Sequence, residues 1–68
     1  MSVAKNIEIT STSTVGFEDA IKKGIERASE TIDNVRGAWI KEQKVDVTDG
    51  KVTEYCVAMI VTFVLSDE

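Results

Sequence analysis

The chain has 68 residues, so we expect one small domain spanning residues 1–68, which by itself buries only a modest fraction of its surface. A net charge of −4, with no run of Lys or Arg, excludes the basic face that nucleic-acid binders normally carry. A single cysteine and no histidine exclude an intrachain disulfide and argue against a structural zinc site. Association with copies of itself is the remaining way to stabilise so small a chain.

The first predicted element is a strand over about residues 3–10, where apolar and polar side chains alternate. The hydroxyl-rich run "TSTST" at residues 10–14 predicts a turn after that strand. Ser13 is the candidate N-cap of a following helix, since its hydroxyl can accept from a free N–H of the first turn. Glu18 and Asp19 then lie early in that helix, where negative charge suits the macrodipole.

An amphipathic helix of about five turns is the next predicted element, because apolar residues recur at steps of three and four. Its apolar stripe consists of Phe17, Ala20, Ile21, Gly24, Ile25, Ala28 and Ile32. Gly24 costs helix propensity, and we interpret it as the point where the helix approaches the sheet closely. The helix should end near Asp33 and Asn34, with Asn34 in a left-handed conformation.

Two strands joined by "TDGK" at residues 48–51 complete the chain, since Asp-Gly between alternating segments is typical of a tight hairpin. Centring the turn on Asp49 and Gly50 predicts three facing pairs, and a bulge would shift them. The pairs are Val47 with Val52, Gln43 with Cys56, and Trp39 with Ile60. The last strand is expected over about residues 52–65.

The two faces of this sheet differ in character. One face of the last strand is apolar throughout (Tyr55, Val57, Met59, Val61, Phe63, Leu65) and should pack against the helix. The other face is expected to collect Gly37, Trp39, Lys41, Gln43, Val45 and Val47 with Cys56 and Ile60. No second helix exists to cover that mixed face, so we expect other copies to cover it. The predicted fold is therefore α+β with order β-α-β-β: an antiparallel sheet with one helix on one face and an oligomer on the other.

Catalysis is not indicated, because the sequence offers neither a histidine-based arrangement nor a glycine-rich phosphate loop. The N-terminal "MSVAKNIEI" lacks a long apolar segment, so neither a signal peptide nor a membrane span is expected. With its one free thiol, the chain suits a reducing compartment, most simply the cytoplasm.

Cys56 is either a small buried residue or a reactive thiol. Trp39 is either interface filler or an aromatic platform for a flat ligand, with Gly37 beside it leaving space for a ring.

The strings "TSTSTVGFEDAI", "RASETIDNV", "DGKVTEY" and "VTFVL", taken in order, resemble the dodecin family over nearly the whole chain. The resemblance implies a homododecameric hollow shell with cubic symmetry, in which each subunit wraps a three-stranded antiparallel sheet around one helix. It also implies binding and storage of a flavin, riboflavin or FMN, without turnover. Flavin-binding members hold pairs of flavin rings between two tryptophans related by a two-fold axis, and a glutamine bonds the ring edge.

This sequence departs from the flavin-binding pattern at both of those contacts. Gly37 occupies the position of the stacking tryptophan, and Trp39 follows two residues later. Cys56 occupies the position of the glutamine, and a thiol cannot replace the paired hydrogen bonds of an amide. A shifted flavin site built from Trp39 and Gln43 on one face is one expectation, and an indole that closes the old pocket is the other.

The string "VRGAWIKEQ" also resembles a dodecin branch that lacks the stacking tryptophan, of which at least one member binds calcium. The resemblance therefore implies an alternative function, a flavin-free shell that binds a divalent cation. Calcium needs several converging oxygen ligands, which symmetry could bring together from different copies. Glu42, Asp46 and Glu54 are the candidate ligands, because their strand positions approach neighbouring subunits.

Overall fold

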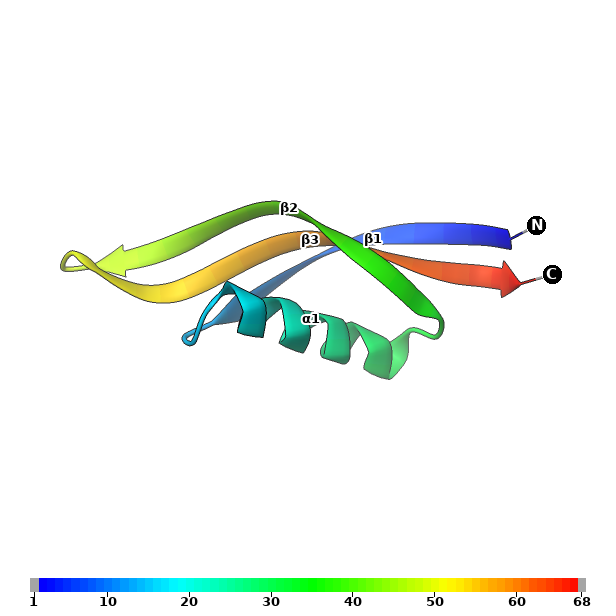
Figure 1. The fold of residues 1–68 in the computed structure, drawn as a ribbon, viewed down its shortest axis with the longest axis horizontal. Coiled ribbons are helices and arrows are strands. Elements are labelled where there is room, and N and C mark those ends of the chain that lie inside the picture. The colour runs from blue at the N-terminus through cyan, green and yellow to red at the C-terminus, as the bar shows by residue number, and fades with distance from the viewer. Residues whose placement is uncertain (1, 68) are drawn as a thin grey trace.

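A computed structural model describes residues 2–67 of the chain. The elements follow the order β1 (Ser2–Ser13), α1 (Phe17–Thr31), β2 (Val35–Thr48) and β3 (Lys51–Asp67). The strands form one antiparallel sheet in the order β1-β3-β2, and α1 lies along one face of it (Figure 1). The predicted β-α-β-β fold with one helix and three antiparallel strands is confirmed.

The link between β1 and α1 differs from the prediction. β1 continues to Ser13, so the hydroxyl-rich run is largely strand rather than turn. The N-cap residue is Gly16, and the proposed cap at Ser13 was wrong. The Ser13 hydroxyl instead accepts from the N–H of Val15 (2.9 Å) and of Gly16 (3.4 Å) and donates to Asp19 Oδ2 (2.6 Å). Ser13 thus ties the end of β1 to the first turn of the helix from outside that helix.

The helix is about one turn shorter than predicted. It ends at Thr31, and the N–H of Ile32 closes the last turn on the carbonyl of Ala28 (3.0 Å). Asn34 adopts the predicted left-handed conformation, with φ of 64°. The chain can therefore reverse into β2 at once, because Asn tolerates this region better than most residues.

The core lies between α1 and the central strand β3. Val57, Met59 and Val61 on β3 and Ala20 on α1 are fully buried, which confirms the predicted helix-facing side. Gly24 is also where helix and sheet come closest, as predicted. A Cβ at this position would clash with Met59 Cε and stand 3.0 Å from Ser11 Cβ.

The β2–β3 hairpin turns where predicted but pairs differently further along. Asp49 (φ 53°) and Gly50 (φ 76°) both have positive φ, as a tight hairpin turn requires. Val47 faces Val52 and Trp39 faces Ile60, as predicted. Between those pairs the register shifts near Thr53 and again at Lys41, so Gln43 faces Val57 and Lys44 faces Cys56. The predicted pairing of Gln43 with Cys56 was wrong, because these bulges move the intervening residues by one position.

The chain on its own is elongated rather than compact. Its principal extents are 53 × 19 × 14 Å, and its radius of gyration is 14.0 Å, against about 11 Å for a compact domain of this length. The sheet continues past both ends of α1, with the β2–β3 hairpin at one end and the ends of β1 and β3 at the other (Figure 1). Every residue of β2 except Val35 is exposed. Within residues 2–67, no helix is long and apolar enough to cross a membrane.

Candidate ligand site on the outer face of the sheet

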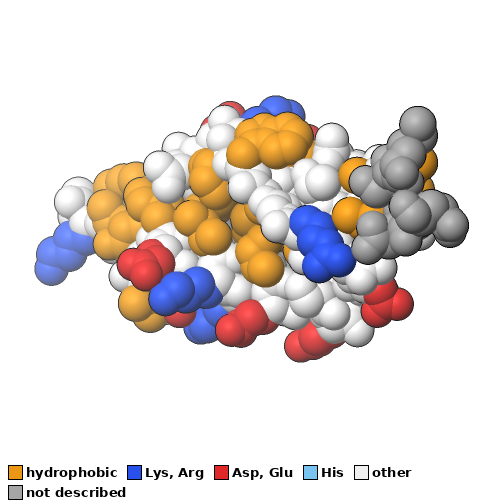
Figure 2. Space-filling view, turned by 45° about the vertical axis from the view of Figure 1, so that its right-hand side comes forward, with side chains coloured by type: hydrophobic (Ala, Val, Ile, Leu, Met, Phe, Trp, Pro, Cys, Tyr) orange, Lys and Arg blue, Asp and Glu red, His pale blue; other side chains and the backbone are white. Residues whose placement is uncertain are grey.

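The face of the sheet opposite α1, here called the outer face, holds most of the predicted site residues. Its members are identified by alternation with the buried β3 residues and by the pairing across the sheet. They are Asn6, Glu8, Thr10 and Thr12 on β1, Gly37, Trp39, Glu42, Lys44 and Asp46 on β2, and Glu54, Cys56, Ala58, Ile60 and Thr62 on β3. Apolar side chains reach the molecular surface in several places, with charged groups around them (Figure 2).

Trp39 lies near the middle of this face with an open space beside it. Its side chain is 53% exposed, and it faces Ile60 across the strand pair. Gly37 lies on the same face, and a Cβ added there would meet no atom within 4 Å. The predicted neighbourhood of Trp39 and Gly37 is therefore present, and one side of the indole is free to contact a ligand or a second copy.

A salt bridge beside Trp39 was not predicted from the sequence. Lys41 occupies the bulge between Ile40 and Glu42, and its Nζ lies 3.2 Å and 3.4 Å from the two carboxylate oxygens of Glu8. Glu8 belongs to β1, so this contact spans the central strand. Both side chains are about half exposed, which limits the pair to roughly 1 kcal/mol or less. Alternation predicts Glu8 and Lys41 on the same face, but their distance across β3 depends on how the three strands align.

Gln43 does not share this face. Its partner Val57 is one of the buried, helix-facing residues, so the Gln43 amide belongs to the helix side of the sheet. The expected platform of Trp39 with Gln43 on a single face was therefore wrong within one chain. Cys56 remains on the outer face as a half-buried free thiol, between Thr12 and Lys44.

The three carboxylates proposed as cation ligands all lie on the outer face. Asp46 and Glu54 face each other directly, and Glu42 lies four residues before Asp46 on the same strand. Neither member of the facing pair takes part in an ion pair within residues 2–67. The same described residues contain no group of three or more Asp, Glu, His or Cys close enough to hold a metal ion. One chain therefore supplies a facing pair of oxygen donors rather than a complete site.

The arrangement is that of a small subunit with an open face and an incomplete site. The dodecin family model matches residues 3–66. This chain belongs to the dodecin family. Dodecins are shells that bind or store small molecules rather than enzymes, which agrees with the open outer face.

The chain is similar to dodecins from two named organisms over most of its length. The calcium dodecin of Mycobacterium tuberculosis is 38% identical over 64 residues, covering 93% of this chain and 89% of the relative. Its crystal structure, described with a novel calcium-binding site, has a TM-score of 0.80 at 35% identity and covers 91% of this chain and 89% of that one. The dodecin from Streptomyces davaonensis has a TM-score of 0.91 at 32% identity and covers 97% of each chain.

Proposed function

We propose that this dodecin forms a homododecameric shell that binds a divalent cation, calcium, through carboxylates of the outer face. The bulge at Lys41 carries this proposal. It places Glu42 and Asp46 on the same face as Glu54, and it moves the Gln43 amide away from the face of Trp39. The similarity to a calcium dodecin supports the same ligand.

The donor set fits calcium chemically. Calcium prefers six to eight oxygen ligands, with carboxylates prominent among them. Facing carboxylates repel each other in the absence of a cation, which makes Asp46 and Glu54 a destabilising pair on their own. Asp46 and Glu54 would hold the ion, and Glu42 from the same or another copy, with water, would complete the shell. The bound ion would supply charge neutralisation between subunits and no reaction chemistry.

Flavin binding is the second candidate, and Trp39 favours it. The indole is accessible, and Gly37 leaves space beside it for a planar ring. The edge of such a ring would lie near the outer-face polar groups, such as the Lys41–Glu8 pair, rather than near Gln43. In either case the function is storage without turnover, and the single thiol keeps the cytoplasm as the expected compartment.

Thermal unfolding with and without calcium tests the first candidate. By linkage, calcium at a hundred times its Kd should stabilise the protein by about 2.7 kcal/mol, and a chelator should reverse the gain. Asp46→Asn and Glu54→Gln should abolish this response, whereas Glu18→Gln on the exposed face of α1 should keep it. An unchanged melting temperature of the wild-type protein in calcium would contradict the proposal.

Flavin fluorescence separates the second candidate from the first. Stacking on Trp39 should quench riboflavin or FMN at micromolar protein, and Trp39→Ala should weaken that quenching. Quenching without any response to calcium would reverse the order of the two candidates.

Assembly is tested independently of ligand by light scattering, since twelve chains of 7.5 kDa make about 90 kDa. A monomer would contradict the shell itself.

A further inference from the structure

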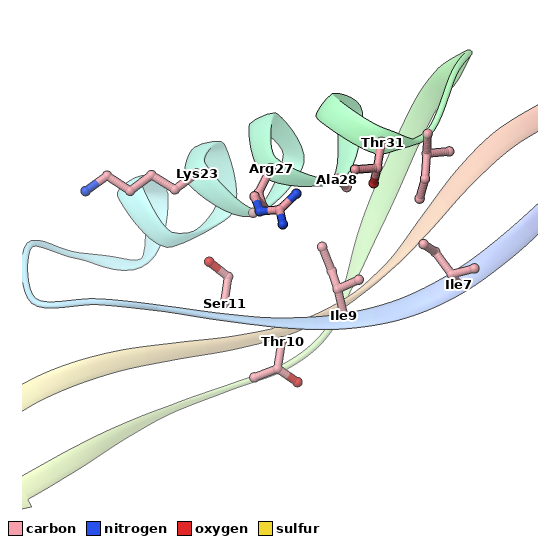
Figure 3. A pocket seen from close by; sticks show the side chains of 10 residues that line it. Ile7, Ile9, Thr10, Ser11, Lys23, Arg27, Ala28 and Thr31 are labelled. Atoms are coloured by element: carbon pink, nitrogen blue, oxygen red, sulfur yellow. The ribbon is translucent and has the colours of Figure 1, made fainter.

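A groove runs between α1 and the edge strand β1, on the helix side of the sheet. Its walls come from the stretch Ile7 to Ser11 of β1 and from one side of α1 between Lys23 and Ile32 (Figure 3). Its volume is about 460 Å³, and small-molecule sites in proteins typically have about 300–1,000 Å³. The α1–β1 groove therefore has room for a small molecule on the side of the sheet opposite the outer face.

The groove is elongated, because it follows a strand and a helix that run side by side. On β1, the lining from Ile7 to Ser11 spans about 13 Å at the rise of a strand. On α1, the lining from Lys23 to Thr31 spans about 12 Å at the rise of a helix. Walls of equal length along a single direction suit a linear chain better than a broad ring.

One end of the groove is apolar. Ile7 and Ile9 extend from β1 toward the helix, and Ile7 lies toward Thr31 at the end of α1 (Figure 3). Ile32, directly after the helix, adds a third isoleucine to this lining. All three isoleucines are only half-buried. A ligand that covers them would remove apolar surface from water, which is favourable in proportion to the area covered.

The other end of the groove is polar and basic. Ser11 lies beside Gly24, where a Cβ would stand 3.3 Å from the Ser11 Oγ. Arg27 extends from the helix over the space between the two walls, and Lys23 reaches toward the N-terminal end of α1 (Figure 3). Among residues 2–67, the lining includes these two cations and no Asp or Glu, although acidic residues outnumber basic ones in the chain. This end therefore favours a negatively charged group.

Acidic neighbours of the two cations limit the charge that this end can accept. Lys23 Nζ lies 3.2 Å from Asp19 Oδ2, and Arg27 Nη1 lies 3.5 Å from Glu30 Oε1. Pairs so close to the surface contribute little, so a ligand can compete for the cations. The Arg27 guanidinium has further N–H donors and can hold a carboxylate through two hydrogen bonds. A doubly charged phosphate would be repelled by Asp19 and Glu30 more strongly than a singly charged carboxylate.

We propose that the α1–β1 groove binds a linear aliphatic carboxylate. The head group would lie on Arg27 and Lys23, and the chain would follow the isoleucines toward the end of the helix. Positive charge at one end and apolar surface at the other determine the direction in which the ligand lies. The site is on the helix side of the sheet, so it rests on neither the cation site nor the flavin site proposed for the outer face.

Isothermal titration calorimetry with decanoate tests the proposal, with the ligand below its micelle concentration and a chelator present to remove calcium. Octanoate should bind more weakly, by up to about fourfold for each methylene group lost. Decanol has the same chain without the charge and should bind about tenfold more weakly, and decyl phosphate should also bind more weakly than decanoate.

Two variants of α1 separate the head group from the chain. Arg27→Gln should weaken decanoate binding about tenfold and leave decanol binding unchanged, because only the carboxylate needs the guanidinium. Lys22→Gln is the matched control, since Lys22 pairs with Glu18 and does not line the groove. It should change the affinity for either ligand by about twofold or less. Both positions are largely exposed, so both variants should fold.

Nuclear magnetic resonance of labelled isoleucine methyl groups locates the ligand in the assembled protein. Decanoate should shift the signals of Ile7, Ile9 and Ile32, whereas the signal of Ile60 on the outer face should not move. Three results would overturn the proposal: no binding of decanoate, decanol bound as tightly as decanoate, or shifts at Ile60 in place of the groove isoleucines. Equal decanoate binding by the wild type and Arg27→Gln would overturn it as well.

Discussion

The helix-covered half of the sheet and the hairpin arm (residues 45–54) are built from the same two strands, β2 and β3, but they lie in opposite environments. Val57, Met59 and Val61 are fully buried under α1, whereas Val47 and Val52 a few residues away remain about half exposed. The cause is length: α1 extends about 22 Å and β3 about 56 Å, so one helix covers less than half of the strand. The fold of the single chain thus depends on one half of the sheet, and the other half is free for partners.

Truncating one residue in each half should expose this difference most strongly. Met59→Ala removes a fully buried side chain and should lower the free energy of unfolding by about 2–5 kcal/mol. Val47→Ala should change the unfolding of the isolated chain by about 0.5 kcal/mol or less, because that side chain is already largely in water. Urea unfolding at low protein concentration measures both values. Equal losses would mean that the arm belongs to the folding core.

The close approach at Gly24 gives the next largest effect. Gly24→Ala gains up to about 1 kcal/mol of helix propensity, but its methyl group would force Met59 and Ser11 to move. We expect a net loss of about 1–3 kcal/mol, as for overpacked cores. Ser29→Ala at an exposed position of the same helix is the control and should stabilise slightly. A Gly24→Ala protein more stable than the wild type would show that the helix can shift away from β3 at little cost.

The turn of the arm should be sensitive for a different reason, backbone conformation rather than packing. Gly50 has a φ of 76°, so Gly50→Val should cost about 1–2 kcal/mol even though a Cβ there meets nothing within 4 Å. Gly37→Ala is the matched comparison, since Gly37 has equal space and no positive φ, and it should be nearly neutral. Thermal unfolding measures both variants. A loss of stability at Gly50 alone would come from backbone strain, because an added Cβ is not crowded at either position.

Sequence patterns predicted the elements and the two faces of the central strand. They did not predict on which face of the sheet the β2 side chains beyond Ile40 lie. The helix stripe and the Asp49–Gly50 turn are local signals, and both were confirmed. The bulges near Arg36, Lys41 and Thr53 are not local signals, because each depends on how two strands align at a distance. Inside the arm, the Thr53 hydroxyl donates to the carbonyl of Asp46 (3.2 Å) next to one of these shifts.

The face of each candidate site residue on β2 was predictable only as far as the strand register was. Trp39 and Gly37 precede the Lys41 bulge, so the alternation rule placed them on the correct face. Gln43 follows the bulge and was assigned to the wrong face, while Glu42 and Asp46 move to the outer one. The sequence alone thus overestimated the polar contacts available to a flavin. It named Glu42, Asp46 and Glu54 as candidate ligands but did not show that they share one face.

The smallest expected effect is the contribution of the Asp19 charge, at the link between β1 and α1, to the stability of the protein. This contribution should depend on pH. The hydrogen bond from the Ser13 hydroxyl, with help from Lys23, lowers the pKa of Asp19 below its ordinary value of 3.8. A carboxyl group with a lowered pKa in the folded state contributes stability above its unfolded pKa and loses that contribution as pH falls through the folded value. Asp19→Asn should therefore destabilise the protein near pH 7, and the difference from the wild type should shrink below about pH 4.

Melting temperatures of both proteins from pH 7 to pH 3 measure this convergence. Glu18→Gln removes the same charge from the same helical turn without the Ser13 hydrogen bond and controls for net charge. Ser13→Ala provides a second comparison, because it removes the donor to Asp19 together with the acceptor for the Val15 and Gly16 amides. If Asp19→Asn and the wild type instead differ by the same amount at every pH, the Asp19 carboxylate does not stabilise the β1–α1 link through its charge.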